Sequence, residues 1–162
     1  TNDLEVAAAA DQYSALVSFD KPGEELVDIL QRVKDELVVY GATSIVMLMG
    51  DLPLLTRKTL DDICGHLDSC DCVVGPDNRD DGTNFLATRK IQSTPIHFGF
   101  PKSFALHCQG FEQVGLKFEC FRSFETGLDL DLPEDYFIFE QWQTSSGNQG
   151  PASLFTTSTT NS

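Results

Sequence analysis

Three aspartates stand where strands are expected to end, and they are the first candidates for chemistry. Asp51 directly follows the apolar run SIVMLMG, and Asp129 and Asp131 lie in the segment GLDLDLPED. Residues two apart on a strand point to the same side, so a strand over 128–132 would present Asp129 and Asp131 together. Because open α/β sheets bind ligands at the carboxyl ends of their strands, we expect the three carboxylates to meet at one edge. Such a group suits magnesium, which supports phosphoryl transfer.

A structural role is the alternative for Asp131. The segment that follows it, Pro133-Glu134-Asp135, has the composition of a first helical turn. Proline is favoured at that position, and acidic side chains interact well with the positive end of the helix dipole. Asp131 can therefore also serve as the cap of this helix.

Two further segments could bind an anion. The loop PDNRDDGTN offers Gly82 for close approach, Thr83 as a hydroxyl donor and Arg79 as a cation, although taken alone it is an ordinary turn. In HFGFPKSFALH, Lys102 and Ser103 lie where a helix begins, and the N–H groups of a helix N-terminus attract phosphate. His107 is expected one turn further on, on the same face as Ser103.

Hydrophobic periodicity predicts strands that alternate with helices, which is typical of an α/β fold with a mostly parallel, Rossmann-like sheet. We expect one domain over 1–143 and a disordered tail rich in serine and threonine over 144–162. The expected strands are 15–19, 44–49, 72–75, 84–88, 117–121 and 128–132. The expected helices are 4–10, 22–40, 103–114 and two that begin at Arg57 and Pro133.

Composition excludes several classes of partner. The net charge of −14 argues against binding to nucleic acid or to an anionic membrane surface, and an anionic substrate would need a cation to offset it. No apolar run approaches the roughly 18 residues of a membrane span. Five cysteines, an odd number, indicate reduced thiols in a cytoplasmic protein. Cys70 and Cys72 with His66 match no common zinc pattern.

The chain has no Walker A loop, no Rossmann glycine fingerprint and no G-x-S-x-G nucleophile elbow. The residues by themselves therefore predict a metal-dependent α/β protein for an anionic ligand, and no more.

Four motifs, taken together and in order, resemble a known family. The segments GDLPLLT, PDNRDDGTNFL, FGFPKSFALH and GLDLDLPEDY resemble the CofC-type guanylyltransferases of coenzyme F-420 biosynthesis, which belong to the molybdenum-cofactor-guanylyltransferase-like nucleotidyltransferases. The resemblance runs from about Thr1 to Tyr136. It implies a nucleotide-diphospho-sugar-transferase-like fold and transfer of GMP from GTP to 2-phospho-L-lactate, phosphoenolpyruvate or a related acid, with release of pyrophosphate.

The resemblance also implies roles for particular residues. Asp51, Asp129 and Asp131 would hold Mg²⁺, and Thr83, Gly99 and Ser103 would bind the phosphorylated acid. Expected partners are GTP and that acid, with a downstream transferase that receives the product and a second copy of the chain as further candidates.

The chain departs from the family pattern in two places. The third motif has Phe100 where the family has a glycine three residues before the serine, and Gly99 lies one residue earlier. The family's first strand and glycine-containing nucleotide loop have no counterpart before Thr1, so we expect an N-terminally incomplete guanylyltransferase domain. The alternatives are a noncatalytic relic of the fold, an interaction module, or a nucleotidyltransferase with another acceptor.

Overall fold

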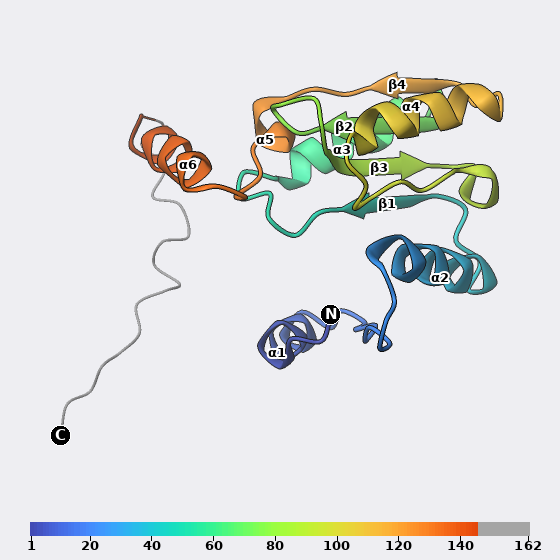
Figure 1. Cartoon of the computed structure of the whole chain (residues 1–162), viewed down its shortest axis with the longest axis horizontal. Coiled ribbons are helices and arrows are strands. Elements are labelled where there is room, and N and C mark those ends of the chain that lie inside the picture. The colour runs from blue at the N-terminus through green and yellow to red at the C-terminus, as the bar shows by residue number, and fades with distance from the viewer. Residues whose placement is uncertain (146–162) are drawn as a thin grey trace.

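A computed structural model describes residues 1–145, in which helices cover both faces of a four-stranded sheet (Figure 1). The strands are β1 (Ile45–Leu48), β2 (Cys72–Pro76), β3 (Thr83–Thr88) and β4 (Phe118–Cys120). The helices are α1 (Leu4–Gln12), α2 (Leu26–Val39), α3 (Arg57–His66), α4 (Ser103–Gln113), α5 (Phe124–Gly127) and α6 (Pro133–Ser145), with a 3₁₀ turn η1 (Ile91–Ser93).

Alternating side chains of the strands fill two cores. On one face Met47, Val74 and Leu86 pack with Phe98 and Phe111, and α2 and α4 cover them. On the other face the strands contribute Val73, Phe85 and Ala87, and Ile63 of α3 packs against them. A period of two along each strand sends successive side chains to opposite faces, which is why one short strand can serve both cores.

The sheet is mixed, which corrects the expectation of mostly parallel pairing. The strand order is β1-β3-β2-β4. β3 pairs antiparallel with both β1 and β2, whereas β2 and β4 pair in parallel, so three of the four strands share one direction. Only residues 77–82 separate β2 from β3. A parallel return needs a crossover of a dozen or more residues, so this short connection forces a hairpin.

Most of the predicted elements form, and two predicted strands do not. The α/β class is confirmed, as are strands over 44–49, 72–75, 84–88 and 117–121 in the form of β1 to β4. The predictions for 15–19 and 128–132 are wrong, because neither segment pairs with a strand in the described part of the chain. Leu16 instead points into solvent, with 97% of its surface exposed.

Two helix boundaries also differ from the prediction. Pro22 precedes the helix instead of opening it, because α2 begins at Leu26 behind a capping box formed by Glu25 and Asp28. At the other end, α6 continues to Ser145. Thr144 and Ser145 therefore belong to a helix, and the rest of the predicted tail, 146–162, lies outside the described residues.

The first and last helices lie apart from the sheet (Figure 1). Within residues 1–145, α1 has no buried residue, and Tyr136, Phe137 and Ile138 on α6 are all exposed. No helix in residues 1–145 is both long enough and apolar enough to cross a membrane.

Candidate functional site

Hydrogen bonds connect three loops at the end of the sheet where β1 and β2 end. The backbone oxygen of Asp51, after β1, accepts a hydrogen bond of 3.1 Å from the N–H of Leu130. Asn78, in the β2–β3 loop, donates its N–H to the carbonyl of Gly127 at 3.0 Å. The side-chain amide of Asn84 donates to that carbonyl too, at 3.3 Å. Asp51, the β2–β3 loop and the segment before α6 therefore share one edge of the sheet.

Asp51 has an unusual environment within this edge. It lies in the turn that follows β1, and the buried side chains of Leu52 and Leu54 anchor the next residues. Its Oδ1 atom is buried and has no hydrogen-bond partner among the described residues. A buried carboxylate oxygen without a partner is costly, so such an atom points to a ligand that is absent from the protein alone.

Asp129 and Asp131 have different surroundings, contrary to the idea that they share one face of a strand. Asp129 is buried, whereas Asp131 is exposed. Burial raises the pKa of the Asp129 carboxyl, and the nearby charges of Asp131 and Asp77 raise it further. Arg79 opposes this shift with a guanidinium nitrogen 3.9 Å from Asp129 Oδ1. Excess negative charge therefore surrounds Asp129, and a cation would relieve it.

Arg79 also connects the β2–β3 loop to α6. Its Nη2 donates a 2.6 Å hydrogen bond to Asp135, whose other oxygen accepts the N–H of Leu132 at 2.8 Å. Hydrogen bonding to Arg79 lowers the pKa of Asp135. Asp135, the third residue of α6, thus accepts the backbone N–H of Leu132 just before the helix, and the alternative capping role considered for Asp131 has no hydrogen bond to support it in residues 1–145.

The carboxylates at this edge fit a magnesium ion only in part. No group of three or more histidine, cysteine, aspartate or glutamate side chains within residues 1–145 is arranged to hold a metal. Magnesium, however, is usually bound by one or two carboxylates together with water and substrate phosphates. The unpartnered oxygen of Asp51 and the charge around Asp129 suit that arrangement. The metal role of Asp51, Asp129 and Asp131 remains a prediction.

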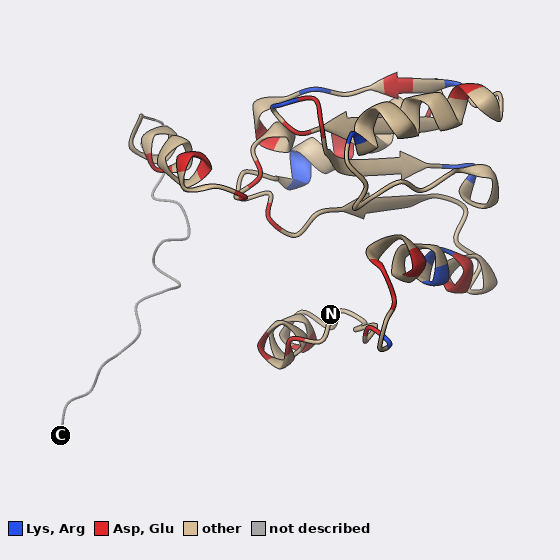
Figure 2. Ribbon diagram, viewed as in Figure 1, with Lys and Arg blue, Asp and Glu red and all other residues tan. Residues whose placement is uncertain are grey.

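Acidic residues dominate this end of the molecule. Figure 2 shows red segments along the β2–β3 loop, after β1 and at the start of α6, with few blue segments among them. Arg79 forms an ion pair with Asp135 and Arg122 forms one with Asp80. At the start of α3, Arg57 and Lys58 pair with Asp61 and Asp62 of the same helix. An anionic substrate would meet repulsion at this surface unless a cation accompanied it.

Asp77, which was not among the predicted site residues, shapes the β2–β3 loop. Its side chain is buried and accepts hydrogen bonds from the backbone N–H groups of Arg79, Asp81 and Gly82, at 2.9, 3.0 and 2.9 Å. An aspartate at the start of a turn commonly binds the backbone two residues on, and that was the available signal. Gly82 is needed for space, because a Cβ atom there would lie 2.9 Å from Asp77 Oδ2.

Thr83, which follows the loop, belongs to a buried cluster of hydroxyl and imidazole groups. Ser103, the first residue of α4, donates a 3.1 Å hydrogen bond from its Oγ to Thr83 Oγ1. Nδ1 of His107 lies 3.0 Å from the same oxygen, and Nε2 of His107 accepts a 2.8 Å hydrogen bond from the backbone N–H of His97. The structure therefore brings together Thr83 and Ser103, as the resemblance implied, and adds His107 to them.

The cluster lies at the N-terminal end of α4. The side chain of Lys102, just before this helix, makes no capping hydrogen bond within residues 1–145, and its backbone is left-handed, with φ of 59°. Gly99 has φ of +82° in a turn closed by a 3.4 Å hydrogen bond from Phe100 N–H to the His97 carbonyl. Only glycine adopts this third turn position readily, so the turn requires glycine at 99 rather than at 100.

Burial keeps His107 uncharged near neutral pH. Desolvation lowers the pKa of His107 from 6.5 to about 4, and the neighbouring His97 contributes to the shift. The pKa of His97 is itself lowered by burial.

This shift predicts that the protein loses stability in mild acid. The unfolded chain takes up a proton at His107 below pH 6.5, whereas the folded chain excludes it down to about pH 4. The contribution of neutral His107 to the free energy of unfolding is therefore complete above pH 6.5 and is lost as the pH falls toward 4. The free energy of unfolding should fall by about 2 kcal/mol between about pH 7.5 and 5. Urea unfolding at several pH values measures it. His107→Asn should show a flatter pH dependence, and an equal slope would contradict the assignment to His107.

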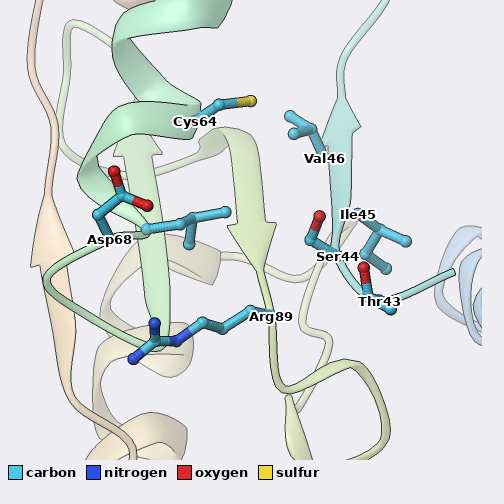
Figure 3. A pocket seen from close by; sticks show the side chains of 8 residues that line it. Thr43, Ser44, Ile45, Val46, Cys64, Asp68 and Arg89 are labelled. Atoms are coloured by element: carbon cyan, nitrogen blue, oxygen red, sulfur yellow. The ribbon is translucent and has the colours of Figure 1, made fainter.

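A pocket of about 420 Å³ lies elsewhere, between the N-terminal end of β1 and the C-terminal end of α3 (Figure 3). Its lining residues are Thr43, Ser44, Ile45, Val46, Cys64, Leu67, Asp68 and Arg89. β1 is an edge strand of the sheet, and the pocket begins at its N-terminal end, whereas Asp51 follows its C-terminal end. None of the predicted site residues lines it.

Comparison with known proteins provides independent information on the family and the fold. Residues 7–141 match the family described as "Guanylyl transferase CofC like". The phosphoenolpyruvate guanylyltransferase of Chloroflexus aggregans is 32% identical over 132 residues, which are 82% of this chain and 64% of that protein. The enzyme of the same name from Thermobaculum terrenum is 33% identical over 115 residues, 70% of this chain and 49% of the relative.

A 2-phospho-L-lactate guanylyltransferase, from Methanocaldococcus vulcanius, is 29% identical over 104 residues, which cover 64% of this chain and 46% of that protein. The chain thus spans about half to two thirds of the length of these relatives. A crystal structure from Desulfovibrio desulfuricans, described as a nucleotide-diphospho-sugar transferase, superimposes with a TM-score of 0.68 at 13% identity, over 90% of this chain and 64% of that one. This likeness confirms the fold.

Proposed function

Because the chain belongs to the CofC-like guanylyl transferase family, we propose that it transfers GMP from GTP to a small phosphorylated acid and releases pyrophosphate. Phosphoenolpyruvate and 2-phospho-L-lactate are the candidate acceptors, after the names of its relatives. The product would enter coenzyme F-420 biosynthesis through a downstream transferase.

One observation in the structure carries the proposal. The buried hydroxyl groups of Thr83 and Ser103 meet at 3.1 Å at the N-terminal end of α4. The β2–β3 loop that ends at Thr83 is joined by Asn78 to the segment before Asp129. That segment is in turn hydrogen-bonded to Asp51 through Leu130. Hydroxyl donors and a helix N-terminus suit a phosphorylated acid, and carboxylates suit the metal that accompanies a nucleoside triphosphate.

The reaction requires little covalent chemistry from the protein. A phosphate oxygen of the acid attacks the α-phosphorus of GTP, and the bond from that phosphorus to the oxygen bridging to the β-phosphate breaks. Pyrophosphate leaves with the electron pair of this bond. The attacking phosphate is already ionised near neutral pH, so no protein base is needed, which agrees with the absence of a nucleophile motif.

The residues of the chain would bind and orient two anionic reactants. Thr83 and Ser103 would hydrogen-bond to the acid, and the turn at Gly99 would shape the loop that leads to Ser103. Asp51 and Asp129, with Asp131 two residues on, would hold magnesium. When bound, this ion would offset the negative charge of the transferring group and of the pyrophosphate.

The test measures pyrophosphate release by the full chain with magnesium and GTP over a panel of phosphorylated acids. We expect release with phosphoenolpyruvate or 2-phospho-L-lactate, and none when the acid is omitted or when ATP replaces GTP. Calorimetry with magnesium–GTP and with each acid measures binding separately. Absence of both GTP binding and pyrophosphate release would overturn the proposal and favour a noncatalytic binding module.

A further inference from the structure

The hydrogen bonds of His107 fix which of its ring nitrogens carries a proton. The ring is completely buried, one helical turn after Ser103. Its Nε2 lies 2.8 Å from the backbone N–H of His97, which can only donate. Nε2 must therefore be the acceptor, and a neutral ring then carries its proton on Nδ1.

This proton determines the role of the Thr83 hydroxyl. Nδ1 of His107 lies 3.0 Å from Thr83 Oγ1 and donates to it, and Ser103 Oγ donates to the same oxygen at 3.1 Å. A hydroxyl oxygen accepts two hydrogen bonds and donates one. Both acceptor positions of Thr83 are thus filled. No hydrogen bond within residues 1–145 uses its own proton once Nδ1 is the donor.

We propose that His107 is a positioning residue that makes the Thr83 hydroxyl an obligatory donor to an anionic oxygen of the phosphorylated acid. This inference rests on the proposed function, because it assigns the acid as the third partner of Thr83. A site with an obligatory donor holds an anionic oxygen well, since a phosphate or carboxylate oxygen can only accept.

The uncharged state of the ring is part of the arrangement. A doubly protonated imidazole would present an N–H to the backbone N–H of His97, and that contact would be repulsive. Burial lowers the pKa of His107 to about 4, so the neutral form persists near neutral pH. The titratable group that faces the ring is His97, whose ring centroid lies 5.3 Å away and which lowers the pKa of His107, while a hydrogen bond with the backbone of Ser103 opposes that shift. The charged residue Lys102 directly precedes Ser103, and the side-chain hydrogen bonds of His107 are made to Thr83 and to the backbone of His97.

The first test is independent of catalysis. Long-range ¹H–¹⁵N spectra of the imidazole groups in the full chain identify the tautomer of each histidine. We expect His107 to have its proton on Nδ1 in the absence of substrates. A proton on Nε2 would overturn the inference whatever the activity of the protein.

The second test uses two substitutions that each keep one half of the ring's hydrogen bonding. The amide nitrogen of asparagine occupies the place of Nδ1, so His107→Asn can still donate to Thr83. The amide of glutamine reaches the place of Nε2, so His107→Gln can still accept from His97 but cannot donate to Thr83. The two variants therefore separate support of the fold from control of Thr83.

We expect His107→Gln to raise the KM for the acid about tenfold and His107→Asn to raise it less than about threefold, as the loss of one hydrogen bond predicts. The KM for GTP and the kcat at saturating acid should change little in either variant. In a Thr83→Val background His107→Gln should have no further effect, because the hydroxyl that it controls is absent.

The outcomes are distinguishable. Equal KM values for the two His107 variants, or additive effects of Thr83→Val and His107→Gln, would overturn the positioning role while the wild-type chain still transferred GMP. Failure of the wild-type chain to use any phosphorylated acid would instead overturn the proposed function, and the assignment of His107 to acid binding with it.

Discussion

Asp51→Asn is expected to lower GMP transfer by about a thousandfold, the size of effect seen when one preorganised electrostatic group is removed from an active site. The carboxylate has a buried Oδ1 without a hydrogen-bond partner among the described residues, so its charge is available to a cation. The substitution keeps the shape of the side chain and removes that charge. Pyrophosphate release at saturating GTP and acid measures the effect, and calorimetry should show weaker binding of magnesium–GTP.

Asp51→Asn should not weaken the fold. Because a buried charge without a partner destabilises the native state, its removal should leave the free energy of unfolding equal or slightly higher. Asp61→Asn is a suitable control, since Asp61 lies exposed on α3 and pairs only loosely with Arg57. Turnover of Asp51→Asn equal to that of the control would refute the metal role of Asp51.

Asp77→Ala is expected to lower the free energy of unfolding by about 3 kcal/mol, because three backbone N–H groups lose a charged acceptor together. These groups belong to Arg79, Asp81 and Gly82, and the loop that they form leads directly into Thr83. The KM for the phosphorylated acid should rise as well, since the hydroxyl of Thr83 would no longer be held in place. Urea unfolding measures the change in stability. The rate of pyrophosphate release at increasing concentrations of the phosphorylated acid measures the change in KM.

Asp77→Asn provides the matched comparison. Its remaining carbonyl oxygen can accept the N–H groups of Arg79 and Asp81, which both bind Oδ1 in the native loop, and only the bond to Gly82 is lost. We expect a loss of about 1 kcal/mol for this variant. A loss as large as that of Asp77→Ala would show that the charge of Asp77, rather than its acceptor geometry, maintains the loop.

The sequence predicted the elements whose side chains follow a clear period and whose ends have strong local signals. Thr56 caps α3 through a 3.1 Å hydrogen bond from the N–H of Thr59, and the apolar run that became β1 ends where Asp51 was expected to follow it. These features depend on residues within one turn or one strand, so they can be recognised without knowledge of the rest of the chain.

The predictions that failed required pairing with distant residues. The segment 128–132 has the alternation of a strand, yet it pairs with no strand among residues 1–145. One hydrogen bond joins it to Asp51, and the adjacent Gly127 accepts hydrogen bonds from Asn78 and Asn84. The direction of β3 likewise follows from its short connection to β2 and from its place between β1 and β2. Alternation determines which face of a sheet a side chain lies on, but it does not determine which strand, if any, the backbone pairs with.

By itself, the sequence determined the α/β class, the family resemblance and the identity of most candidate site residues, because each depends on residue type and order along the chain. Only the tertiary structure decided that Asp129 is buried while Asp131 is exposed, and that Asp51 Oδ1 has no hydrogen-bond partner within residues 1–145. It alone placed His107 against Thr83, which is 24 residues away in the chain. Burial and hydrogen-bond partners depend on which segments pack together, and local residue patterns do not contain that information.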